Sequence, residues 1–268
     1  MNISTLERHF VKIGKGLKIE VLPERNWRMR STDFTLDVAG SGKNEVFHLS
    51  LNEGAKDLPE IQILDVRPDE KALLLMVRDE HKSKFLCGMD EFNKGYVAAI
   101  PLNRGATNVK TAKEALKPEA VIESQSKAGV KEKHKNKRKT KGWIRQGEWF
   151  FVPAPDFEVR SNDIICNNEP FNRTGSRNHT AQQMVRRGGE LVYQFGIQVI
   201  SATEYNRRIK DPKFHPQMWR QSTENATFYV KGRITAPDHS TLVLNDWHTV
   251  HSNQEHLAPT RNHVRFLD

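Results

Sequence analysis

The chain has 268 residues and a formal net charge of +9 at pH 7, and 37% of its residues are hydrophobic. No apolar run approaches the roughly 18 residues of a membrane span, and charges interrupt the N-terminal segment, so we expect a cytoplasmic protein with neither a signal peptide nor a membrane partner. Two cysteines, Cys87 and Cys166, are too few for a disulfide framework or a zinc ribbon, and we expect both to be reduced.

The first half carries the signals of an α+β domain that covers residues 1–120. Apolar and polar residues alternate in three segments, the period of half-buried strands: residues 16–23, 34–38 and 46–51. We interpret residues 17–51 as a small antiparallel β meander. The apolar run 72–77 fits either a buried strand or part of a helix, and the pattern leaves both open.

Two further elements are predicted in this half. Residues 84–101 have the pattern of a hairpin, with apolar strands on either side of a polar turn. Residues 107–118 indicate a helix, because Thr107 or Asn108 can cap its N-terminus and Pro118 ends it.

A strongly basic segment, residues 127–141, follows this domain. It contains eight Lys and Arg residues and a single acid, Glu132, so it carries +7 of the formal +9. Such a segment has no apolar face to bury, and we therefore predict a flexible basic linker over residues 121–142. Its charge indicates a polyanionic partner.

The second half, residues 143–268, is predicted to be a His-containing domain of mostly antiparallel β structure. Residues 149–153 are the most strand-like run, and a polar loop covers residues 162–178. Residues 180–187 fit a short helix that ends at Gly188-Gly189. The strands that follow are expected at 190–195, with a possible extension to 200, and at 228–234 and 241–244, which form a hairpin. The predicted fold class is thus α+β, with two small domains joined by the basic linker.

The basic segment and the aromatic residues after it are the candidate nucleic-acid interface. Its members are Lys131, Lys133, Lys135, Lys137, Arg138, Lys139, Lys141, Trp143 and Arg145. An exposed ring among Trp143, Trp149, Phe150 and Phe151 could stack on an unpaired base, although alternating aromatics in a strand are more often part of a core. A merely solubilising segment is the alternative interpretation.

Histidines form the second candidate site, since seven of the 11 follow the basic segment. We select His179, His239, His248 and His251 as candidate catalytic residues. Two of them could serve as general acid and base for phosphodiester cleavage, with Arg177 or Lys231 to hold a phosphate. One alternative is a metal site built from two or three of His239, His248, His251 and Asp238 or Asp246. Hydrogen-bonded structural histidines are another. No chelating spacing such as HExxH is present, so we assign no metal ligands and no cofactor.

Three compact runs have the look of signatures without indicating an activity: residues 85–91, 147–153 and 237–248. The acidic pair Asp90-Glu91 lies beside a predicted turn, where solvated carboxylates are common, and receives no role. We expect a nucleic-acid-binding protein, with RNA or single strands favoured. The alternatives are a phosphodiesterase or nuclease with a His-based or metal site in the second domain, and an assembly module that binds an acidic protein.

Overall fold

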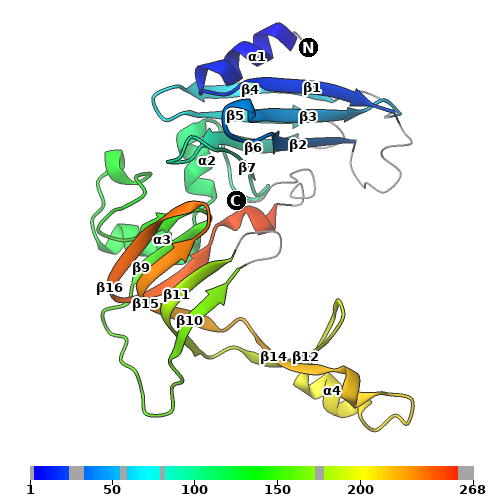
Figure 1. Cartoon of the computed structure of the whole chain (residues 1–268), viewed down its shortest axis with the longest axis vertical. Coiled ribbons are helices and arrows are strands. Elements are labelled where there is room, and N and C mark those ends of the chain that lie inside the picture. Colours follow the sequence, from blue (N-terminus) through cyan, green and yellow to red (C-terminus); the bar gives the residue numbers. More distant parts are fainter. Residues whose placement is uncertain (1–2, 24–32, 55–58, 79–81, 173–177, 259–268) are drawn as a thin grey trace.

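The computed structural model describes residues 3–23, 33–54, 59–78, 82–172 and 178–258. Figure 1 shows two small sheets and helix α1 at one end of the molecule, a six-stranded sheet below them, and a smaller unit that projects from that sheet. The α+β class is confirmed. Within the described ranges, no helix combines the length and the apolar character needed to cross a membrane.

The first sheet has the order β1-β3-β2, with β1 Leu17–Leu22, β2 Phe34–Ala39 and β3 Val46–Asn52. All three strands were predicted, but the antiparallel meander is wrong, because β1 pairs with β3 in parallel. Alternating residues reveal a strand and its buried face, but they do not reveal its neighbour. Helix α1 Ile3–Lys12, which was not predicted, packs beside this sheet through Leu6 and Phe10.

The second sheet is an antiparallel meander in the order β4-β5-β6-β7, with bounds Glu60–Arg67, Ala72–Arg78, Lys82–Met89 and Gly95–Ala99. Strand β5 is the apolar run that the sequence left open between strand and helix. One of its faces packs in the core shared with the first sheet and the other packs against helix α2, Val109–Ala115. Burial on both sides explains why its residues do not alternate. Asn108 caps α2 as predicted, with Oδ1 accepting from Thr111 N at 2.9 Å.

The basic segment has defined structure, and a flexible linker is not confirmed. Helix α3, Glu119–Lys127, occupies the start of the predicted linker, and a 3-10 turn follows at Glu132–His134. The buried ammonium of Lys117 donates to the Lys135 carbonyl oxygen at 2.6 Å, and Arg145 N donates to the Arg138 carbonyl oxygen at 2.7 Å. These contacts fasten the segment to α2 on one side and to the second half on the other.

The six-stranded sheet has the order β10-β11-β15-β16-β9-β8. In chain order its strands are β8 Ile144–Gln146, β9 Trp149–Pro153, β10 Cys166–Phe171, β11 His179–Arg187, β15 Thr227–Ala236 and β16 His239–Ser252. The predicted hairpin at 228–244 is β15 and β16. Residues 180–187 form a strand, so the predicted helix is wrong, and β10 lies within the predicted loop 162–178. A register shift between Ala181 and Gln183 interrupts the alternation of β11, which hid the strand period.

The projecting unit is inserted between β11 and β15. It consists of β12 Glu190–Phe195, β13 Gln198–Ser201, α4 Ala202–Arg208 and β14 Arg220–Glu224, and its sheet has the order β13-β12-β14. The sequence left open an extension of the preceding strand over residues 196–200. Gly196, with φ of +58°, instead turns the chain back so that β13 pairs with β12.

The two halves contact each other directly. The 3-10 turn Gln254–Leu257, at the end of the second half, returns to the first. Glu255 Oε1 accepts a hydrogen bond from Ala99 N at 3.4 Å, Gln254 N donates to the Leu116 carbonyl oxygen at 2.9 Å, and Ala258 is buried in the core of the first half. A cavity lies at this junction.

Candidate functional site

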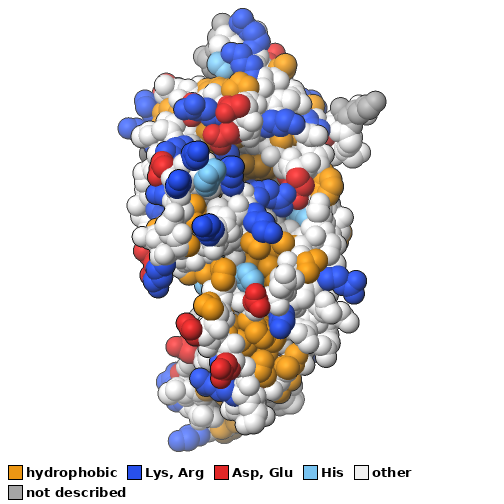
Figure 2. All heavy atoms as spheres, turned by 90° about the vertical axis from the view of Figure 1, so that its left-hand side faces the viewer, with side chains coloured by type: hydrophobic (Ala, Val, Ile, Leu, Met, Phe, Trp, Pro, Cys, Tyr) orange, Lys and Arg blue, Asp and Glu red, His pale blue; other side chains and the backbone are white. Residues whose placement is uncertain are grey.

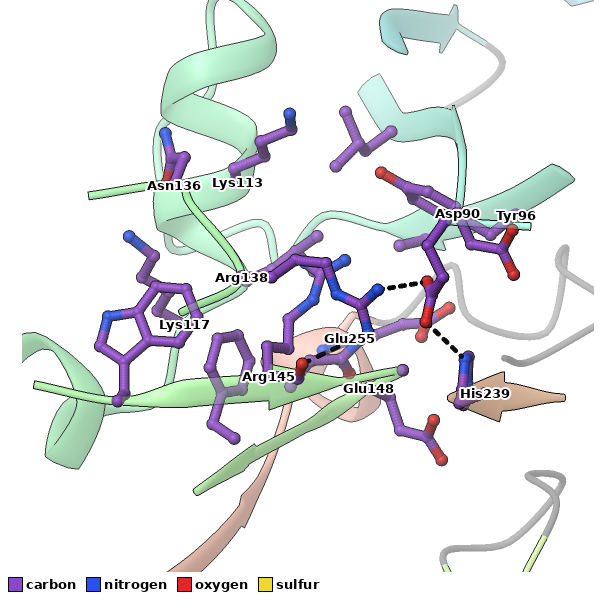
Figure 3. A pocket seen from close by; sticks show the side chains of 18 of the residues that line it. Asp90, Tyr96, Lys113, Lys117, Asn136, Arg138, Arg145, Glu148, His239 and Glu255 are labelled. Carbon is purple, nitrogen blue, oxygen red and sulfur yellow. Dashed lines mark hydrogen bonds and ion pairs between the residues drawn. The ribbon is translucent and has the colours of Figure 1, made fainter. Parts of the chain in front are cut away.

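The cavity at the junction has a volume of about 60 Å³ and is lined by four parts of the chain. These are the β6–β7 turn, the end of α2, the basic segment with the β8–β9 hairpin, and the chain around the β15–β16 turn and Glu255. In Figure 3, acidic and basic side chains from these parts face the same space. Such a volume has room for one ion with a few waters, or for one phosphate group.

A buried trio of Glu148, His179 and His239 forms the chemical centre of this region. Glu148 and His239 line the cavity and His179 lies beside them, and one ligand atom from each is within 4.8 Å of the other two. The three residues are only 3%, 1% and 9% exposed. The imidazole ring centroids are 5.6 Å apart. Two nitrogen ligands and one carboxylate can hold a divalent metal ion.

Two tight turns place the trio. Glu148 lies in the β8–β9 turn and His239 directly follows the β15–β16 turn, while His179 begins β11. Gln146 Nε2 donates to the Ser240 carbonyl oxygen at 2.6 Å and thereby holds the two turns together. Gly147 has φ of +56°, and an added Cβ there would lie 2.5 Å from His239 Nε2, so glycine is needed both for the turn and for the ring.

The β6–β7 turn brings carboxylates to the other side of His239. Glu91 Oε1 lies 3.6 Å from His239 Nδ1, and Glu91 Oε2 lies 2.6 Å from Arg138 Nη1. Burial acts to raise the pKa of Glu91, but hydrogen bonds from its own backbone N–H and from Arg138 outweigh burial, and the pKa is lowered. Asp90, Glu91 and His239 form a second group with ligand atoms within 4.8 Å. Glu91 is therefore an ionised group between the basic segment and the trio.

Cationic side chains form the opposite wall of the cavity. Arg138, Arg145, Lys113 and Lys117 all line it. Lys117 is 2% exposed and donates to Glu114 Oε1, to Gln125 Oε1 and to the Lys135 carbonyl oxygen at 2.6–2.9 Å. Burial lowers its pKa, whereas the hydrogen bond to Glu114 opposes that shift. These bonds show that Lys117 holds the segment. Of the two arginines, Arg138 already pairs with Glu91, and Arg145 remains for an anion.

The structure separates the four histidines selected from the sequence. His179 and His239 come together in the trio. His248 Nδ1 instead contacts the Asp246 carbonyl oxygen at 2.8 Å, and His251 Nε2 contacts Thr249 Oγ1 at 2.9 Å, and neither lines the cavity. Burial lowers the pKa of both.

The two residues proposed to hold a phosphate beside these histidines are not at the cavity. Lys231 pairs with Gln183 in the sheet and does not line the cavity. Arg177 lies outside the described residues.

The candidate interface residues also fall into different surroundings. Five lysines are exposed: Lys131, Lys133, Lys137, Lys139 and Lys141. Lys135 pairs with Glu132 at 2.9 Å, and Arg138 and Arg145 are half-buried at the cavity. Trp143 cannot stack on a base, because it is 2% exposed in a cluster with Val121 and Phe150. Trp149, Phe150 and Phe151 are buried as well, so the expectation of an exposed ring among these four aromatics is wrong.

Sequence reasoning missed the acidic members of the site, Glu148, Asp90, Glu91 and Glu255. Three of them stand in runs that were noted without an assignment, because residues 85–91 end in Asp90-Glu91 and residues 147–153 begin with Gly147-Glu148. The third run, 237–248, supplies His239. Their convergence on one cavity is the signal that the separate patterns lacked.

Comparison with protein-family models, with curated proteins and with solved structures finds no match for this chain. Its function is therefore inferred from the geometry of the site alone.

Proposed function

We propose that the protein is a metal-dependent phosphodiesterase that acts on nucleic acid. The observation that carries this proposal is the buried trio of Glu148, His179 and His239, with ligand atoms within 4.8 Å of one another beside a cavity. Two histidines and one carboxylate are a ligand set of catalytic zinc sites, in which a fourth position is left for water. Ligand atoms bind Zn²⁺ at about 2.0–2.2 Å, so a modest inward closure of the trio would seat an ion.

A metal-free histidine pair fits this geometry less well. A general acid and a general base act from different sides of a phosphodiester, each within about 2.6–3.2 Å of the oxygen it serves. That arrangement separates the two imidazoles by the width of a phosphate group. His179 and His239 are instead clustered with Glu148 between close-packed rings, which supports shared coordination of one ion.

The groups around the trio suit hydrolysis at phosphorus. A metal-bound water has a strongly lowered pKa and can attack. An ion held by Glu148, His179 and His239 would supply such a water. The water oxygen would bond to phosphorus as the bond from phosphorus to the leaving oxygen breaks, Glu91 would accept the water proton, and solvent would protonate the leaving oxygen. Arg138 and Arg145, on the cavity wall, would stabilise the negative charge that develops on the phosphate oxygens.

The basic segment supports nucleic acid as the substrate. Its five exposed lysines are near Arg138 and Arg145, two residues that line the cavity, in the sequence. Within the described part of the chain, no acidic side chain forms an ion pair with these lysines. Each phosphate that a lysine neutralises releases counterions, and the resulting affinity is independent of sequence. The segment would therefore concentrate nucleic acid at the mouth of the site.

The test is a cleavage assay on labelled single-stranded RNA and DNA, with chelator and then with added Zn²⁺ or Mn²⁺. We expect chelator to abolish cleavage and metal to restore it. Glu148→Gln and His179→Gln should each lower both activity and bound metal, measured by elemental analysis. His251→Gln, at a half-buried histidine that does not line the cavity, should retain both. Absence of metal binding by the folded wild type, or cleavage that persists in chelator, would overturn the proposal.

A further inference from the structure

Two grooves along the basic segment lie next to the cavity at the trio. One groove, of about 650 Å³, lies between α2 and the segment, and it shares Lys113 and Asn136 with the cavity. The other groove, of about 510 Å³, shares Lys137 with the first and extends past Lys131 and Lys139 to Lys141. Because neighbouring hollows share lining residues, the three lie side by side along the basic segment, and we call this row of hollows the path.

The charges along this path are arranged for a string of anions. In the groove beside α2, Lys110 pairs with Glu132 at 2.6 Å and Lys113 pairs with Glu70 at 2.5 Å, so each acid already has a cationic partner. Hydrogen bonds from Lys110 and Lys135 lower the pKa of Glu132 to about 2. The five exposed lysines of the segment take no part in these ion pairs. Figure 2 looks onto this side of the molecule and shows Lys and Arg side chains gathered around its middle.

We infer that this path binds the backbone of single-stranded nucleic acid and delivers one of its phosphates to the trio. The inference rests on the proposed function in one respect, which is that cleavage takes place at the trio. The cavity admits about one phosphate group, and the trio is at most 9% exposed. A duplex is too wide and stiff to bring a phosphate that far, whereas a flexible single strand can lie along the lysines and bend inward.

The path also explains why the basic segment is held in place. A flexible segment would attract nucleic acid without giving it direction. Lys117 and the Arg138–Glu91 ion pair instead fix the segment beside the cavity, and the cavity that the path adjoins is lined by Arg138. A strand that follows the lysines therefore arrives at Arg138.

Binding and cleavage are measured separately. Binding uses metal-depleted wild-type protein in chelator, with a fluorescent single-stranded RNA of about ten nucleotides, the same RNA annealed to its complement, and polyglutamate as an acidic polypeptide. Two triple variants with the same charge change are compared: Lys131→Gln/Lys133→Gln/Lys137→Gln on the path, and Lys210→Gln/Lys213→Gln/Arg220→Gln on the projecting unit. Thermal unfolding confirms that both variants are folded.

We expect the path variant to bind the single strand at least about tenfold more weakly at moderate salt. The slope of log K against log salt should become shallower by about 2, since each single-strand phosphate contact contributes about 0.7. The control variant should match the wild type. Equal weakening by the two variants, equal affinity for the duplex, or tighter binding of polyglutamate than of RNA would each overturn the inference.

Cleavage, with metal restored, distinguishes this inference from the proposed function. The wild type should cleave the longer strand with a kcat/KM at least about tenfold above that for a dinucleotide, and the path variant should lose most of that advantage. The expected binding pattern without cleavage under any metal would remove the phosphodiesterase and leave the path. Metal-dependent cleavage with no preference for length would remove the path and leave the phosphodiesterase.

Discussion

Replacement of Gly147 by alanine tests whether the turn at the cavity is shaped around His239. The added Cβ would lie 2.5 Å from His239 Nε2, a distance that Cβ atoms essentially never show, so one group must move. The ring has little freedom, because it is buried and lies between Glu91 at 3.6 Å and the His179 ring at 5.6 Å. The Gly147→Ala change should therefore displace the ring from the trio.

The cost has two parts, and a second glycine separates them. Gly147 has φ of +56°, where an L-residue costs about 1–2 kcal/mol. Gly196 has φ of +58° but open space around its Cβ position, so Gly196→Ala should lose only that amount. Gly147→Ala adds the strain of overpacking, about 1–3 kcal/mol. We expect a total loss of about 2–5 kcal/mol.

The assay has two parts. Urea denaturation gives the stability of both variants, and each metal-depleted protein is then titrated with Zn²⁺ in the absence of urea, where it is fully folded. Gly147→Ala should bind zinc at least about tenfold more weakly than the wild type, since the position of His239 sets the ligand geometry. Gly196→Ala should bind like the wild type. Equal losses of stability in the two variants, with zinc affinity unchanged in both, would refute this account of the turn.

Other changes give distinct outcomes. Trp143→Ala should lower the free energy of unfolding by about 3–5 kcal/mol in urea titrations, as expected for a core residue; an exposed base-stacking residue would leave it nearly unchanged. Burial lowers the pKa of His248 and His251, so below the ordinary value of 6.5 the unfolded chain binds more protons than the folded chain, and stability should fall as pH drops from 7.5 to about 5. His251→Gln should make that fall smaller, and a pH dependence identical to the wild type would contradict the assignment. Lys117→Met removes the donor to the Lys135 carbonyl oxygen, so trypsin should cut the basic segment faster than in the wild type, while the rest of the protein is cut at an unchanged rate. An unchanged rate of cutting in the segment would mean that other contacts hold it.

Local patterns in the sequence determined the elements whose causes are themselves local. The alternation in 34–38 and 46–51 predicted β2 and β3, the cap at Asn108 predicted α2, and the two strands around residues 235–240 predicted the β15–β16 hairpin. In each case the residues that form the element carry enough information, because periodicity and capping act over a few positions.

Tertiary structure decided what depends on distant partners. The parallel pairing of β1 with β3 and the register shift in β11 are set by neighbouring strands, which no local period records. The same holds for the basic segment. Its composition indicates a solvated chain, whereas contacts with other elements, among them Lys117, Lys110 and Glu91, show where it is held.

The candidate site was only half visible for the same reason. His179 and His239 could be selected by residue type, but His248 and His251 looked equivalent in the sequence. What distinguishes them is that two turns and the start of a third strand meet at one cavity and bring Glu148 to the first pair. A ligand set is a property of atoms within a few ångströms in space, and strands distant in sequence reach that distance only when the sheet pairs.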